Sequence, residues 1–156
     1  MTALLEGGNV FKDKMGVPLT RRIKQDEIPA TIKWLESVTK LDLHGETDSA
    51  TGYPTKWLGS TGKKPDSGDL DLAVETSVVT KPELKAALDR YVTQQQQDPR
   101  DFVRMSGEAV HFKTPIAGDA NRGFVQTDFM FFPNLDWGTF FYAGCEDSAY
   151  KGMNRN

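Results

Sequence analysis

The sequence has a single cysteine, Cys145, which excludes a disulfide within the chain and favours a reducing compartment. Basic residues are not in excess: the formal net charge is −3, so any nucleic-acid partner would have to bind a local basic patch. No apolar run is long enough to span a bilayer, and the first residues lack the basic-then-apolar layout of a signal peptide. We therefore expect a cytoplasmic protein with no membrane partner.

The composition is that of a globular domain. The chain has 156 residues, of which 38% are hydrophobic and 26% charged, and this balance excludes a largely disordered protein. The length is sufficient for one domain with a buried core. Residues 1–28 show no sustained period and are expected to form an irregular arm. Residues 29–145 are assigned to the domain, and residues 146–156 to a polar tail that could open a further helical region.

Periodic segments predict two helices. Residues 28–41 carry apolar side chains at helical spacing. Residues 80–95 begin with a capping box formed by Thr80 and Glu83 and continue as an apolar stripe.

Alternating or apolar segments predict the strands. These segments are residues 53–59, 69–75, 108–116 and 123–132, with an additional edge strand at residues 137–144. The order of helices and strands favours an α+β fold, an α/β sandwich in which helices pack against one face of a mixed sheet.

Two aspartates alternate with leucines in the predicted strand 69–75. Asp69 and Asp71 project from one face, about 6.6 Å apart along the backbone, while Leu70 and Leu72 face the other side. Neighbouring carboxylates in such a strand repel each other and are costly to desolvate. A cation between them would offset both costs, and Mg²⁺ takes oxygen ligands.

Asp128 is the only acid in the apolar strand 123–132. If the two strands are neighbours, Asp69, Asp71 and Asp128 meet and could hold two divalent ions, as in sites that catalyse phosphoryl displacement. Two alternatives stay open at this point. Asp69 and Asp71 could lie at a solvated strand end paired with lysine, and Asp128 could lie on an exposed edge strand.

The segment before the aspartates has the features of a phosphate-binding turn. Gly59 leaves room for a phosphate to approach the backbone, and Ser60 offers a hydroxyl and its own N–H. Lys63 and Lys64 can neutralise phosphate charge nearby. The spacing of these residues fits neither a Walker A loop nor an EF-hand loop.

The order of these motifs resembles a known family. "LGS", then "SGDLDLAV", then a distant "TDF" is similar to the DNA polymerase β-like nucleotidyltransferase superfamily. That family has a Gly-Gly or Gly-Ser turn, a spaced pair of acids and a third acid on a later strand. The resemblance covers residues 29–132, and "EGGNVFKD" near the start is similar to the opening of some phage-encoded members. It implies a nucleotidyltransferase-like fold.

The resemblance also implies roles for the residues. Gly59 and Ser60 would hold the triphosphate of an NTP, with ATP as the first expectation. Asp69 and Asp71 would bind both of two Mg²⁺ or Mn²⁺ ions, and Asp128 would bind the catalytic ion and help activate an acceptor hydroxyl. The family does not name the acceptor, which could be a nucleic acid, a protein or a small molecule. A partner chain or a C-terminal region could complete the pocket.

Two other functions remain open. A non-catalytic nucleotide-binding or interaction protein, such as an antitoxin-like or phage accessory component, could retain the fold, although the presence of all three acids favours activity. A glycosyltransferase could also use an Asp-x-Asp metal site, but the upstream Gly-Ser pair and the short chain disfavour it. His44 and His111 lack the spacing of metal ligands and are expected to be structural or surface residues.

Overall fold

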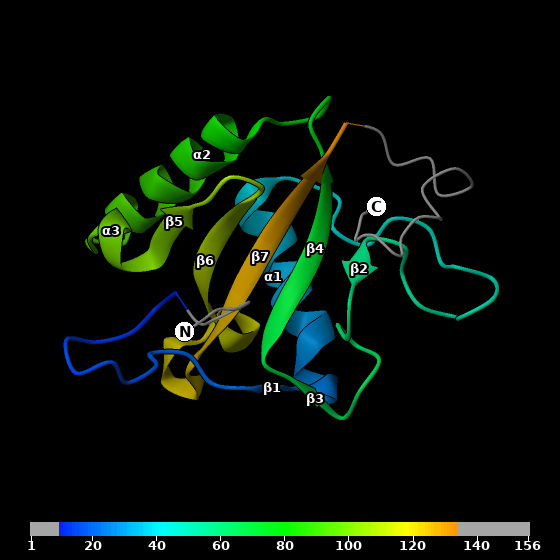
Figure 1. Cartoon of the computed structure of the whole chain (residues 1–156), viewed down its shortest axis with the longest axis horizontal. Coiled ribbons are helices and arrows are strands. Elements are labelled where there is room, and N and C mark those ends of the chain that lie inside the picture. Colours follow the sequence, from blue (N-terminus) through cyan, green and yellow to red (C-terminus); the bar gives the residue numbers. More distant parts are fainter. Residues whose placement is uncertain (1–9, 134–156) are drawn as a thin grey trace.

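The computed structural model describes residues 10–133, which form a five-stranded sheet backed by helices (Figure 1). The α-helices are α1 (Ile28–Thr39), α2 (Lys81–Gln94) and the single-turn α3 (Pro99–Phe102). The strands are β1 (Ile23–Lys24), β2 (Trp57–Leu58), β3 (Asp66–Ser67), β4 (Asp69–Glu75), β5 (Val103–Met105), β6 (Ala109–Pro115) and β7 (Phe124–Phe132). Short 3-10 turns are η1 (Gln25–Glu27), η2 (Ile116–Gly118) and η3 (Ala120–Arg122).

The sheet is mixed. Its strand order is β2-β4-β7-β6-β5, and a separate two-stranded ladder pairs β1 with β3. β4 and β7 run parallel, whereas the other neighbours in the sheet run antiparallel. The predicted α+β class with a mixed sheet is confirmed. The parallel contact joins two segments far apart in the sequence, with α2, α3, β5 and β6 lying between them along the chain.

One face of the sheet carries the hydrophobic core. Leu70, Leu72, Phe112 and Phe129 are buried from solvent there and belong to one cluster with the apolar stripes of α1 and α2. In Figure 1, α1 lies behind β4 and β7. A fully buried leucine or phenylalanine side chain contributes roughly 1.5–3 kcal/mol. A one-residue slip of β4 would turn its leucines out of the core, so the core fixes the register of the strand.

Helix α2 begins as the sequence predicts. The Thr80 hydroxyl accepts a hydrogen bond from the backbone N–H of Glu83, and the Glu83 carboxylate accepts one from the N–H of Thr80 at 2.9 Å. The buried side chains of the helix are Leu84, Leu88 and Val92. This spacing directs one stripe of the helix toward the sheet.

The described part of the arm, residues 10–28, packs against the domain. Phe11 and Ile23 are buried, and Ile23 pairs with Ser67 in the β1–β3 ladder. The backbone N–H of Arg21 donates to the carbonyl of Phe124 at 2.7 Å. Apart from β1 and η1 the segment is irregular up to the start of α1.

Several short elements have no counterpart in the sequence prediction. Two of them lie between α2 and β6: the helix α3 and the edge strand β5, which is three residues long and exposes Arg104 and Met105. Neither is long enough to show a period in the sequence. The predicted strand at residues 137–144 and the tail at residues 146–156 lie outside the described residues. Within residues 10–133, no helix is both long and apolar enough to cross a bilayer.

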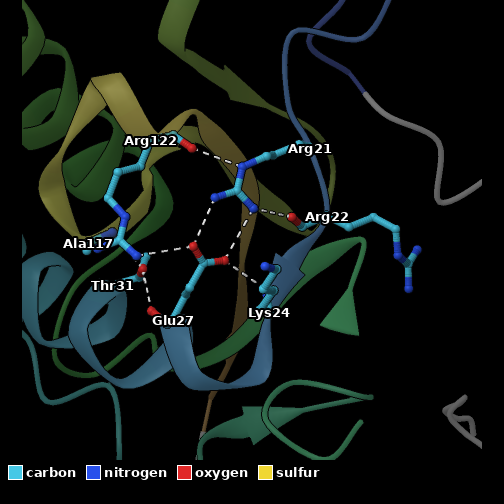
Figure 2. Close-up of polar contacts among 7 residues, drawn as sticks. All are labelled: Arg21, Arg22, Lys24, Glu27, Thr31, Ala117 and Arg122. Atoms are coloured by element: carbon cyan, nitrogen blue, oxygen red, sulfur yellow. Dashed lines mark hydrogen bonds and ion pairs between the residues drawn. The ribbon is translucent and has the colours of Figure 1, made fainter. Parts of the chain in front are cut away.

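A partly buried carboxylate joins the arm, α1 and the β6–β7 connection (Figure 2). The Glu27 carboxylate, 10% exposed, accepts hydrogen bonds from the Arg21 guanidinium at 3.0 and 3.2 Å and from Arg122 at 3.3 Å. The backbone N–H of Lys24 adds a fourth donor at 2.9 Å. These partners, Arg21 first, lower the pKa of Glu27 to about 2 from an ordinary 4.5.

Replacing Glu27 is expected to destabilise the fold in a pH-dependent way. Because the pKa of Glu27 is lowered on folding, its contribution is full above pH 4.5 and is lost as the pH falls toward 2. Glu27→Gln should lower the free energy of unfolding by roughly 1–2 kcal/mol at pH 7, and by much less at pH 2.5. Urea unfolding at both pH values measures this, with Asp26→Asn, an exposed neighbour, as the control. An equal loss at the two pH values would contradict the ion-pair account.

Candidate metal centre

Three carboxylates converge on the face of the sheet opposite the core, which we call the open face. Asp69 and Asp71 lie on β4 and Asp128 on β7, where the parallel register pairs Asp71 with Asp128. Side chains of paired residues project from the same face, so all three acids point to one place. Each offers a carboxylate oxygen within 4.8 Å of the others. Because β7 is an interior strand, the alternative that put Asp128 on an exposed edge is wrong.

The protein supplies little positive charge to these acids. Burial, the charge of Asp128 and a hydrogen bond with Asp128 together raise the pKa of Asp69 to about 6, although the charge of Arg22 opposes the shift. Burial and the charges of Asp69 and Asp128 raise the pKa of Asp71 well above its ordinary value. A divalent cation would supply the missing charge, and carboxylate oxygens are the ligands that Mg²⁺ and Mn²⁺ prefer. The donor set therefore fits the expected metal.

The predicted glycine turn lies directly beside the acids. Gly59 follows β2, which pairs with β4 so that Leu58 is opposite Asp71. Gly59 has a φ of +57°, and a Cβ at this position would lie 3.0 Å from Oδ2 of Asp71. Glycine is favoured here for two reasons: the left-handed backbone and the close approach of the carboxylate.

Thr61 fixes this turn against β4 and was not singled out from the sequence. Its side chain is fully buried, and Oγ1 accepts a hydrogen bond from the backbone N–H of Asp71 at 2.9 Å. The backbone N–H of Thr61 donates to the carbonyl of Leu58 at 3.1 Å. A threonine within a loop carries no signal of such a role, which depends on the pairing of β2 with β4.

The other predicted phosphate-binding residues, Ser60, Lys63 and Lys64, differ in their contacts. The Ser60 hydroxyl lies 3.3 Å from the hydroxyl of Ser67. The Lys63 ammonium donates to the backbone carbonyl of Trp57 at 3.1 Å, and desolvation lowers its pKa. Lys64 is exposed and has no hydrogen bond or ion pair within residues 10–133. Neither lysine is among the charges that shift the pKa of Asp69 or Asp71.

Arg22 is a basic residue whose charge acts on Asp69. Its charge lowers the pKa of Asp69, although burial of Asp69 outweighs it. Two guanidinium nitrogens bind Oδ1 of Asp66 at 2.7 and 3.0 Å, and the third, Nη1, lies 3.3 Å from where a Cβ of Gly68 would be. Figure 2 shows the Arg22 side chain pointing away from the Glu27 cluster that holds Arg21. The sequence alone does not show that Arg21 and Arg22 have different partners. The difference follows from the β1–β3 ladder, because Asp66, the partner of Arg22, lies on β3.

His111 is also part of the site. It pairs with Asp128 across β6 and β7, and its Nδ1 lies 2.7 Å from Oδ1 of the aspartate. The sequence placed His111 on a strand but gave no partner, because the partner depends on the register of the hairpin.

A second group of possible ligands is already satisfied by the protein. Glu36 Oε2 accepts hydrogen bonds from His44 Nδ1 at 2.9 Å and from the N–H of Leu43 at 2.8 Å. Asp42 accepts from two backbone N–H groups and pairs with Lys56 at 3.6 Å. With these donors in place the cluster does not need a cation, in contrast to the three acids on the open face.

Comparison of the chain with models of known families, with curated proteins and with solved structures gives no match.

The metal-free protein is expected to lose stability as the pH rises through the pKa of the acids. Because the pKa of Asp69 is raised to about 6, the folded state binds that proton more tightly than the unfolded state. The stabilisation is full below the ordinary value of 3.8 and is lost above pH 6. In EDTA at pH 7.5, Asp71→Asn should therefore raise the melting temperature, by about 2–4 °C for each kcal/mol of repulsion removed.

The control for this experiment is Asp26→Asn, which removes an exposed carboxylate far from the acids along the chain. The gain from Asp71→Asn should shrink toward pH 4, where the raised pKa values keep Asp69 and Asp71 protonated. A wild-type protein more stable than Asp71→Asn in EDTA at pH 7.5 would show that the acids do not repel one another.

Proposed function

We propose that the chain is a divalent-metal-dependent nucleotidyltransferase, which moves a nucleotide from an NTP to an acceptor hydroxyl and releases pyrophosphate. The observation that carries the proposal is the convergence of Asp69, Asp71 and Asp128 beside the turn at Gly59. The resemblance to the DNA polymerase β-like superfamily favours the same chemistry. On this proposal the fold is a nucleotidyltransferase-like form of the α+β class.

The three acids would divide the work as the resemblance implies. Asp69 and Asp71 would hold two Mg²⁺ or Mn²⁺ ions, and Asp128 would join them at the catalytic one. When bound, the ions would stabilise negative charge on the attacking and leaving oxygens. The raised pKa values of Asp69 and Asp71 mean that these acids must lose their protons before they bind a cation, so metal affinity should rise through pH 6.

The strand order gives the site two sides. The Gly59 turn follows β2, next to β4, whereas Asp128 lies on β7 on the other side of β4. Displacement at phosphorus needs the attacking and leaving oxygens roughly in line. We assign the triphosphate to the side of the Gly59 turn and the acceptor hydroxyl to the side of Asp128, which is then placed to help activate it.

Three groups would bind the triphosphate. The first is the backbone of Gly59 and Ser60, whose N–H groups would donate to phosphate oxygens, and the second is the exposed Lys64, whose ammonium would neutralise phosphate charge. The third group is Arg22, whose positive charge lowers the pKa of Asp69. Lys63, which is bonded to the carbonyl of Trp57, would have to release this contact to take part.

The proposal is tested by nucleotide binding and transfer. Wild-type protein should bind α-labelled ATP, or another of the four NTPs, only when Mg²⁺ or Mn²⁺ is present. With the right acceptor it should transfer the label and release pyrophosphate. Asp71→Asn should lose metal-dependent binding, while Asp26→Asn should retain it. Equal binding by wild type and Asp71→Asn would refute the site, and metal-dependent binding without transfer to any acceptor would favour the non-catalytic alternative.

Arg22→Gln separates triphosphate binding from metal binding. The variant should weaken NTP affinity by about tenfold, the effect of losing one charge-assisted contact of about 1.4 kcal/mol. Mn²⁺ affinity without nucleotide should stay the same or rise, because a positive charge near Asp69 is removed. Isothermal titration with each ligand measures both quantities. Unchanged NTP affinity would exclude Arg22 from the phosphate site.

A further inference from the structure

Asp128 differs from the other two acids in how it is held. Its side chain is 14% exposed, as is that of His111 beside it, and His111 Nδ1 lies 2.7 Å from Asp128 Oδ1. Gln126, two residues earlier on β7, donates from Nε2 to the same oxygen at 3.0 Å. Within residues 10–133, no histidine or amide side chain donates to the carboxylates of Asp69 or Asp71.

Both lone pairs of Asp128 Oδ1 are therefore in use. A carboxylate oxygen has two such acceptor positions, and His111 and Gln126 fill them from two directions. Gln126 is 4% exposed and is itself held, because its Oε1 accepts a hydrogen bond from the backbone N–H of Val10 at 2.9 Å. Only Oδ2 of Asp128 is left without these donors.

The imidazole is fixed from its other side by Ser106. The Ser106 Oγ lies 3.1 Å from His111 Nε2, closer than its 3.5 Å contact with the carbonyl of Ala109. An ionised carboxylate can only accept, so Nδ1 of a neutral His111 carries the proton and Nε2 accepts from the Ser106 hydroxyl. Ser106 lies in the β5–β6 turn, where Lys81 of α2 donates to the carbonyl of Gly107.

We propose that His111, oriented by Ser106, is a positioning residue that makes Asp128 a one-oxygen ligand of the metal centre. With Oδ1 held, the carboxylate cannot turn to bind one ion through both oxygens, nor bridge two ions with one oxygen each. Within residues 10–133 no histidine or amide side chain holds Asp69 or Asp71 in this way, so both of their carboxylate oxygens would remain available to a cation. This inference rests on the proposed metal-dependent function and assigns to His111 a role that the sequence motifs do not include.

The role resembles that of outer residues in other metal sites, where partners that orient a ligand matter nearly as much as the ligand. Loss of such a partner typically lowers metal affinity by about 10–100-fold. A hydrogen bond that serves only the fold would affect unfolding but not the affinity for a small cation. The two possibilities are therefore separated by measuring metal affinity and stability on the same variants.

The experiment measures Mn²⁺ affinity without nucleotide, by electron paramagnetic resonance of the free ion, for wild type, for Asp71→Asn and for three further variants. His111→Phe keeps a planar ring but has no donor, and should weaken Mn²⁺ binding by about 10–100-fold. His111→Asn keeps an N–H near the position of Nδ1 and should recover most of the affinity. Ser106→Ala changes an exposed turn residue and should weaken binding by a smaller factor, about 2–5-fold.

The melting temperature of each variant in EDTA reports its fold, and Ser106→Ala keeps the test valid if His111→Phe does not fold. The positioning role would be overturned if folded His111→Phe and Ser106→Ala both bind Mn²⁺ with an affinity within twofold of wild type. A loss in His111→Asn as large as that in His111→Phe would also overturn it. If wild type binds no Mn²⁺, the proposed metal centre fails and this inference with it. If wild type binds Mn²⁺ and Asp71→Asn does not, only the role of His111 is at stake.

Discussion

The parallel pairing of β4 with β7 is the contact on which the candidate site depends. It places Asp71 opposite Asp128, although the two residues are separated in the chain by two helices and two strands. The register is fixed from the core side, because Leu70 and Leu72 must face the helices. The acids then have to share the open face. The packing of the hydrophobic core thus offsets the repulsion among the acids, which would not converge by themselves.

The partly buried carboxylates of the chain lie in two different kinds of environment. Glu27 is surrounded by Arg21, Arg122 and a backbone N–H, and its pKa is lowered. Asp69 and Asp71 are brought together without such partners, and their pKa values are raised. A fold that needed these acids only for packing could have paired them with arginine, as it does Glu27. The gathering of uncompensated acids at one point supports the proposal that a cation completes this site.

Local patterns in the sequence were sufficient to predict the elements that depend on residues near one another in the chain. The capping box of Thr80 and Glu83, the alternation at residues 69–75 and the strands at residues 108–116 and 123–132 were all confirmed. The convergence of Asp128 with the other acids could be stated only as a condition, because no local pattern shows which strands are neighbours.

The partners of the acids were beyond the sequence for the same reason. His111 meets Asp128 through the register of an antiparallel pair, and Arg22 approaches Asp69 through the short β1–β3 ladder. Lys63 illustrates the opposite case: it lies close to the motif in the sequence, but its ammonium binds the carbonyl of Trp57. Proximity along the chain was a weaker guide to the site than strand pairing, and strand pairing is a property of the folded molecule.

The most direct test of this account is a crystal structure of the protein grown with Mn²⁺, measured at a wavelength where manganese scatters anomalously. The account predicts anomalous density among the carboxylates of Asp69, Asp71 and Asp128, with Oδ2 of Asp128 as its contributing oxygen. Well-ordered acids with no anomalous density between them, at Mn²⁺ concentrations that saturate ordinary carboxylate sites, would contradict it.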